Sequence, residues 1–148
     1  MDPSAEVGLV IGDGAALPFR ARSFDVVVTA DTLEHVPSLR RRAFLAECTR
    51  FAARAVVVAG PFAHPRVDEA EEILQSFLRH KLQLEHRYLE EHRTHGLPDQ
   101  TEAEAILRAN GANDATSIGH GSLERWLLLI CLSCTSITTP TSGGSLRA

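Results

Sequence analysis

Lysine, cysteine, aromatic residues and long hydrophobic runs are all scarce in this 148-residue chain. It has 19 acidic against 15 basic residues, a net charge of −4, so it offers no polybasic patch to nucleic acid or anionic lipid. Its three cysteines are too few for a disulfide scaffold, and their odd number fits a reducing compartment. The longest strongly apolar run, residues 126–132, is far too short to span a bilayer, and the polar first residues exclude a signal peptide. We therefore expect a cytoplasmic domain with neither nucleic acid nor membrane as a partner.

The first half of the chain alternates short apolar runs with a helix-like stretch. Residues 7–11, 24–30 and 55–59 are continuous runs rich in valine and isoleucine, which is typical of strands buried on both faces of a parallel sheet. Between the last two runs, residues 38–54 place apolar side chains at helical spacing. The order strand, helix, strand predicts a βαβ unit with a right-handed crossover.

The second half is expected to be mostly helical. Its predicted elements are an amphipathic helix over 67–91, whole or broken in two, a helix capped by Thr101 and Glu104 and ended by Asn110, a short strand over 115–118, and a helix or buried strand over 122–132, with helix favoured. The last residues are rich in serine, threonine and glycine. We therefore expect one domain over 1–132 and a flexible tail over 133–148.

Polar side chains follow each predicted strand of the first half. Asp13 follows the first run, Asp31, Glu34 and His35 follow the second, and His64 follows the third. Ligands of open α/β sheets bind outside the carboxyl ends of the strands, so these side chains are candidates for a site. The alternative is that Asp13 is a turn residue and that Glu34 and His35 begin a solvated helix. The residues alone leave both interpretations open.

An ordered series of short motifs covers about fifty residues of the first half. The motifs are Gly12-Asp13-Gly14, Leu17-Pro18-Phe19, Ser23 to Val27, Leu33 to Pro37, and Phe44-Leu45 with Glu47 and Arg50. The series resembles the middle of class I S-adenosylmethionine-dependent methyltransferases of the broad small-molecule type, similar to methyltransferase type 11. The resemblance implies an α/β fold, namely a partial Rossmann-like doubly wound sheet from the family's third to fifth strands onward, followed by a helical C-terminal half.

The resemblance also implies roles in binding S-adenosylmethionine. Asp13 would accept a hydrogen bond from the adenine amino group, and the Gly14 amide would reach a ring nitrogen. Ala30 and Asp31 would line the methionine end of the cofactor. These four residues are the predicted cofactor site.

The acceptor of the methyl group would lie beside the same edge. Leu33 and Glu34 would border the transfer channel, and His64 falls on the same substrate side because it follows the third run. His35 is the candidate catalytic residue, since a histidine that titrates near neutral pH can orient or deprotonate an acceptor. The implied activity is methyl transfer to a small-molecule or lipid-like acceptor.

The sequence departs from the family at the Gly-rich turn that usually follows the first strand. No glycine stands at position 17 or 124 to complete a G-x-G-x-x-G pattern. We therefore expect a domain truncated before its third strand, with an open sheet edge and weak or no binding of the cofactor. The alternative is a non-catalytic α/β module that associates with a partner, or with itself, through that edge.

Four histidines in the second half also suggest a metal site. His80, His86, His92 and His95 lie in a charged helical stretch, but their spacing matches no zinc motif. We expect a solvated helix face and no metal. Cys131 and Cys134, a single pair, are expected to serve packing.

Overall fold

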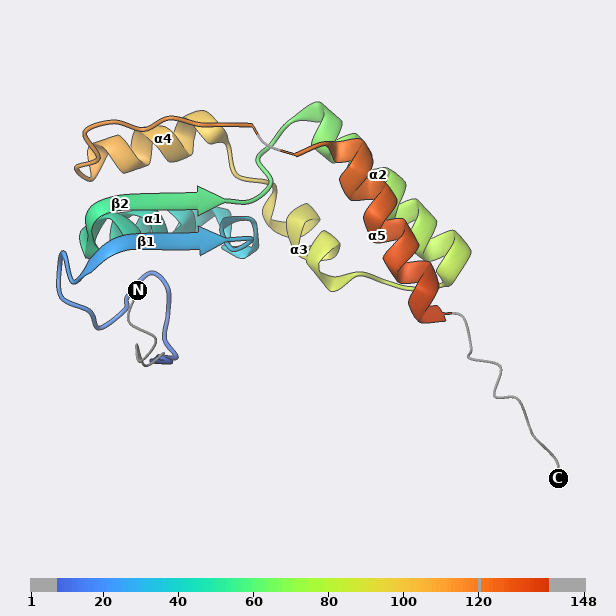
Figure 1. The fold of residues 1–148 in the computed structure, drawn as a ribbon, viewed down its shortest axis with the longest axis horizontal. Helices are drawn as coiled ribbons and strands as arrows, with labels where there is room; N and C mark the ends of the chain where they lie inside the picture. The colour runs from blue at the N-terminus through green and yellow to red at the C-terminus, as the bar shows by residue number, and fades with distance from the viewer. Residues whose placement is uncertain (1–7, 120, 139–148) are drawn as a thin grey trace, which may run out of the picture.

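The computed structural model describes residues 8–119 and 121–138 (Figure 1). Its elements alternate strand and helix at first and are then entirely helical. In chain order they are β1 (Phe24–Ala30), the 3₁₀ helix η1 (Leu33–His35), α1 (Ser38–Phe51), β2 (Ala52–Ala59), α2 (Pro65–Phe77), the π-helix η2 (Leu78–Leu82), α3 (Arg87–His95), α4 (Gln100–Ala109) and α5 (Leu123–Thr138).

The two strands and α1 form the βαβ unit that the sequence predicts. β1 and β2 are parallel neighbours, with Val26 opposite Ala55 and Ala30 opposite Ala59. The helix α1 connects them and lies behind the sheet in the view of Figure 1. Because the strands are parallel, their carboxyl ends lie at the same edge of the sheet.

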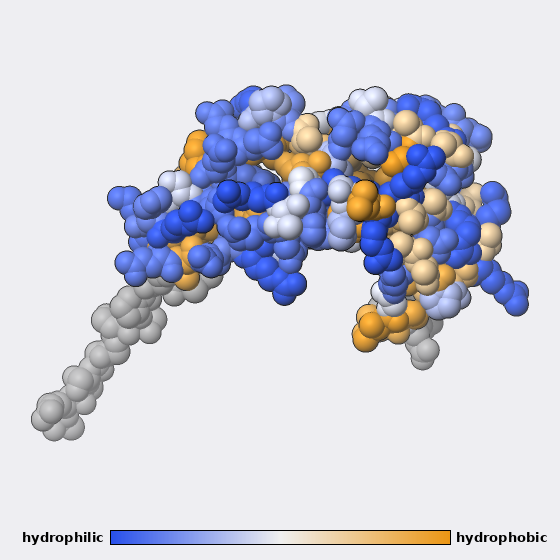
Figure 2. Space-filling model, turned by 180° about the vertical axis from the view of Figure 1, so that it is seen from behind, coloured by the Kyte–Doolittle hydropathy of each residue, from blue (hydrophilic) through white to orange (hydrophobic). Residues whose placement is uncertain are grey.

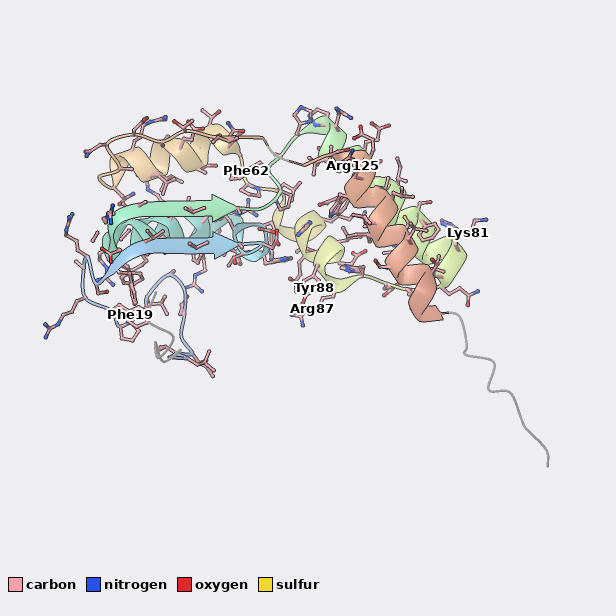
Figure 3. All side chains as sticks on the ribbon, viewed as in Figure 1. Phe19, Phe62, Lys81, Arg87, Tyr88 and Arg125 are labelled. Carbon is pink, nitrogen blue, oxygen red and sulfur yellow. The ribbon has the colours of Figure 1, made fainter. Side chains whose placement is uncertain are left out.

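A first core cluster joins the βαβ unit to α4. The side chains of Leu33, Leu45 and Ile106 are at most 5% exposed, and Ala103 completes the cluster. Partly buried apolar residues surround them, among them Phe62, which follows β2 (Figure 3). This cluster holds η1 and α1 against α4.

A second core cluster lies within the helical half. Leu74, Leu78 and Leu89, from α2, η2 and α3, are its buried members. Cys131 and Cys134 of α5 pack against them, which confirms the packing role expected for this pair. Figure 1 shows α2 and α5 side by side, with α3 between them and the sheet.

Arg41 of α1 ties the end of α3 to η1. Its guanidinium donates to the backbone carbonyls of Leu33 and Val36 at 3.2 and 3.0 Å, and to those of His95 and Gly96 at the end of α3. A positive charge beside the carbonyl end of a helix is favourable, because those groups lack partners within the helix. Arg41 is thus a link between the two halves.

Two of the expected strands are not strands in the structure. Residues 8–11 and 115–118 have no strand structure, while Val7 lies outside the described residues. The side chains of Leu9 and Ile11 are 87% and 93% exposed, and Ile118 is 83% exposed. An apolar run becomes a strand only when a neighbouring strand satisfies its backbone, and neither run has one among the described residues.

Helix boundaries also differ from the expectation. The stretch 67–91 is broken, as one of the two expected alternatives had it: α2 and η2 end before Gln83, which is in the left-handed conformation, and α3 begins at Arg87. The cap of α4 is Asp99, whose carboxylate accepts from the Glu102 amide at 2.7 Å, and not Thr101. The helix α5 continues to Thr138, so that residues 133–138 do not belong to a tail; residues 139–148 lie outside the described part.

The sheet face opposite α1 is bare among the described residues (Figure 1). Val26, Val28 and Val57 on the strands are 48%, 64% and 46% exposed. The opposite view, Figure 2, shows a mainly hydrophilic surface with an apolar protrusion at the N-terminal segment. No helix within 8–119 or 121–138 combines the length and hydropathy needed to cross a bilayer.

Candidate functional site

The carboxyl edge of the two strands gathers polar side chains. The Asp31 amide donates to the Ala59 carbonyl at 2.8 Å, which extends the pairing of β1 and β2 by one bond. Asp31 itself has φ +47°, in the left-handed region that aspartate tolerates better than most residues. This conformation ends β1 and turns the chain directly into η1.

Glu34 is buried at this edge. The residue is only 1% exposed, and its Oε2 has no hydrogen-bond partner among the described residues. Gly60, after β2, permits this position, since a Cβ there would lie 2.9 Å from Glu34 Oε2. Burial raises the pKa of Glu34, and the nearby Asp31 charge raises it further, whereas His35 and His92 act in the opposite direction.

His35 lies between η1 and α3. Its Nδ1 is 3.0 Å from Glu91 Oε2, and its ring centroid is 5.1 Å from that of Tyr88. The His92 ring is nearer still, at 4.8 Å. With 23% of its side chain exposed, His35 remains accessible from solvent. Figure 3 shows Tyr88 at the start of α3.

His92 belongs to this cluster, which corrects the expectation of a solvated helix face. Its side chain is 11% exposed, its Nδ1 lies 2.8 Å from Glu71 Oε1 of α2, and its Nε2 is buried with no hydrogen-bond partner in the described chain. Sequence reasoning considered His92 and set it aside as part of a solvated helix face, and it missed Glu71 and Glu91 as site residues. The packing of α3 against η1 brings them to the edge, and no local motif signals that.

Asp13 and Gly14 lie in a turn against α1. The Asp13 carboxylate accepts from the Ala15 amide at 3.0 Å and pairs with Arg40 in the first turn of α1. The Arg40 hydrogen bond holds the pKa of Asp13 below its usual value. A Cβ on Gly14 would lie 2.9 Å from the Phe44 ring, so the position requires glycine unless the ring moves. Asp13 therefore performs the turn role, with about half of its side chain still exposed.

The remaining predicted residues divide between edge and core. Ala30 and Asp31 are exposed at the end of β1, where a ligand can reach them. Leu33 is 2% exposed and packs in the first core cluster, so its side chain supports the edge from below and borders no open channel in this structure. His64 is the N-cap of α2, where its Nδ1 accepts from the Arg66 amide at 3.1 Å. That bond gives His64 a structural role.

The chemistry of the edge is that of carboxylates and imidazoles. Ligand atoms of Glu34, His35 and His92 all lie within 4.8 Å of one another, the donor set of a metal site. The exposed carboxylates of Asp13 and Asp31 can accept hydrogen bonds from amino groups, as the adenine and methionine ends of S-adenosylmethionine would require. The residues present therefore fit such a group at its polar ends.

Comparison with known proteins addresses the first half of the chain. Residues 2–58 match the family model described as a methyltransferase domain. Searches of curated proteins and of solved structures gave no match. The matched segment contains β1, α1 and almost all of β2, the βαβ unit whose edge carries the candidate site. Residues 2–58 are thus similar to the methyltransferase domain family, and the similarity is confined to this part of the chain.

Proposed function

We propose that the protein takes part in S-adenosylmethionine-dependent methyl transfer to a small-molecule or lipid-like acceptor. The observation that supports this proposal is that the family match and the polar edge of the sheet fall on the same part of the chain. The methyltransferase match ends one residue before the end of β2, and the edge at which β1 and β2 end gathers the polar side chains. Ligands of open α/β sheets bind at that edge.

The cofactor side is formed by Asp13, Gly14, Ala30 and Asp31. Asp13 pairs with Arg40, which lowers its pKa, and its half-exposed carboxylate is the acceptor for the adenine amino hydrogen. The left-handed Asp31 presents its carboxylate at the end of β1, where it lines the methionine end. The cofactor, when bound, supplies the methyl group as an electrophile on a sulfonium.

The acceptor side is formed by η1 and the helices within 67–110. His35 is the accessible base, and Glu91 beside its Nδ1 stabilises the imidazolium that forms when the ring takes the acceptor proton. Tyr88 flanks the ring and is 57% exposed, so an acceptor can lie against it. Glu34, buried next to His35 in η1, borders the same acceptor position. Alignment of the acceptor atom, the methyl carbon and the sulfur lowers the barrier to transfer, as in any displacement between two bound groups.

Nuclear magnetic resonance of the chain titrated with S-adenosylhomocysteine tests the cofactor side, because it detects weak binding that calorimetry misses. We expect amide shifts confined to Asp13, Gly14, Ala30 and Asp31, with a dissociation constant well above the low micromolar range. Asp13→Asn should weaken the response, and Asp25→Asn, an exposed strand residue outside the edge, should not.

Two results would count against methyl transfer. Shifts absent at saturating ligand, or located on α2 and α5 instead, would remove the cofactor site. Failure of the full chain to transfer label from methyl-labelled S-adenosylmethionine to any acceptor in a panel would count against the activity.

A second candidate function is supported by the bare sheet face. Val26, Val28 and Val57 expose apolar surface on the side opposite α1. A partner-binding α/β module would use that face or the adjoining strand edge, without any catalysis. Absence of S-adenosylhomocysteine binding together with a stable stoichiometric complex would favour this candidate over the first.

A further inference from the structure

We propose that Glu34, His35 and His92 form a binding site for a divalent transition-metal ion, with Zn²⁺ the best match. The proposal goes beyond methyl transfer and does not rest on it: with Nδ1 of His35 facing Glu91, a bound ion takes Nε2, so that His35 serves as a base only in the metal-free chain. The three residues come from η1 and α3, 58 positions apart at the most distant, and the fold brings their ligand atoms within 4.8 Å of one another.

The first argument is burial without partners. Glu34 is 1% exposed and its Oε2 has no hydrogen-bond partner in the described chain; the buried Nε2 of His92 has none either. Burying a carboxylate without compensation is costly, and native structures rarely leave such groups unsatisfied without a reason. A cation held between Glu34 and the two imidazoles satisfies these atoms at once.

The second argument is the support behind each histidine. The Nδ1 of His92 lies 2.8 Å from Glu71, so its N–H donates to that carboxylate and the lone pair of Nε2 is left for a metal. The Nδ1 of His35 is 3.0 Å from Glu91 Oε2, at ion-pair distance but without hydrogen-bond geometry, and Arg87 holds Glu91 through a 2.7 Å bond. A carboxylate behind a ligating histidine is the usual arrangement in metal sites, where it fixes the ring and raises its basicity.

The donor set indicates which ion fits. Two imidazole nitrogens and one carboxylate oxygen suit Zn²⁺, whereas Mg²⁺ and Ca²⁺ favour oxygen ligands. Three protein ligands around zinc leave a fourth position for water or a substrate atom, the composition of open zinc sites. In a bound tetrahedral site, ligand atoms stand about 3.4 Å apart, so the side chains close by roughly 1 Å when the ion binds.

Charge around the cluster favours a cation. Glu71 and Glu91 lie directly behind the histidines, and Asp31 is close enough to Glu34 to raise its pKa. Two described arginines lie near the cluster: Arg87 is paired with Glu91, and the guanidinium of Arg41 donates to backbone carbonyls, including that of Glu34 at 3.4 Å. The 23% exposure of His35 provides the path by which the ion enters from solvent.

The test uses the full chain without an affinity tag, first stripped with a chelator and then titrated with Zn²⁺ in a calorimeter. We expect one equivalent to bind, and Co²⁺ at the same site to give visible absorption of a four- or five-coordinate ion. His92→Gln and Glu34→Gln should abolish stoichiometric binding. Glu71→Gln, which keeps all three ligands, should weaken it about 10- to 100-fold.

His80→Gln is the matched control, because His80 is exposed on η2 and bonds to the Ser76 backbone. It should bind Zn²⁺ as the unchanged chain does, and circular dichroism must show each variant folded. Absence of binding overturns the proposal. So does binding that survives His92→Gln, or that His80→Gln weakens as much. Either result leaves the S-adenosylhomocysteine titration unaffected, so the two proposals fail separately.

Discussion

At the scale of single residues, the burial of Glu34 lowers the stability of the metal-free fold. A charged group without a partner is penalised more than a neutral amide of the same shape. We therefore expect Glu34→Gln to raise the free energy of unfolding of the chelator-treated chain by about 1–2 kcal/mol at neutral pH, measured by urea denaturation. With Zn²⁺ added, the unchanged chain should become the more stable of the two, because only that chain keeps the Glu34 carboxylate as a metal ligand.

Glu72→Gln, an exposed change on α2, is the control and should leave the stability unchanged within error. A Glu34→Gln chain that is less stable than the original without metal would show that the carboxylate has favourable partners in solution.

At the scale of elements, Arg41 holds the end of α3 where His92 can meet η1. Arg41→Lys removes the fork that reaches the carbonyls of η1 and of His95 and Gly96 together. We expect a loss of about 2 kcal/mol in unfolding free energy, as hydrogen bonds to a charged group imply, and a weaker affinity for Zn²⁺. Arg42→Lys, exposed on the next position, should change neither quantity. Equal effects of the two changes would refute the role of Arg41.

The elements also show what sequence reasoning could reach. The βαβ unit was predictable because residues 24–30 and 55–59 are continuous apolar runs separated by a helical period, and each run finds the other as its partner. Residues 8–11 are also an apolar run and form no strand, since composition does not reveal whether a neighbouring strand is present. Glu34 and His35 could be predicted from their place after β1. His92 could not, because only the tertiary contact of α3 with η1 makes it part of the site.

At the scale of the whole molecule, the bare sheet face is an apolar surface open to solvent. Val28→Thr with Val26→Thr keeps the shape and β propensity of the strand while adding hydroxyls to the exposed face. We expect the original chain to self-associate with rising concentration in static light scattering, and this double variant to remain a monomer. Ile73→Thr, on the exposed surface of α2, is the control and should associate as the original does. A monomeric original chain would exclude the face as an interface.

The residues of the candidate site are supported by two different core clusters. Glu34 and His35 are fixed by the first cluster, since Leu33, the first residue of η1, is one of its members, while His92 lies on α3, whose Leu89 belongs to the second. A ligand that binds Glu34 and His35 of η1 together with His92 of α3 therefore connects the two halves of the molecule. A bound ion would add a second link between η1 and α3, beside the one that Arg41 makes.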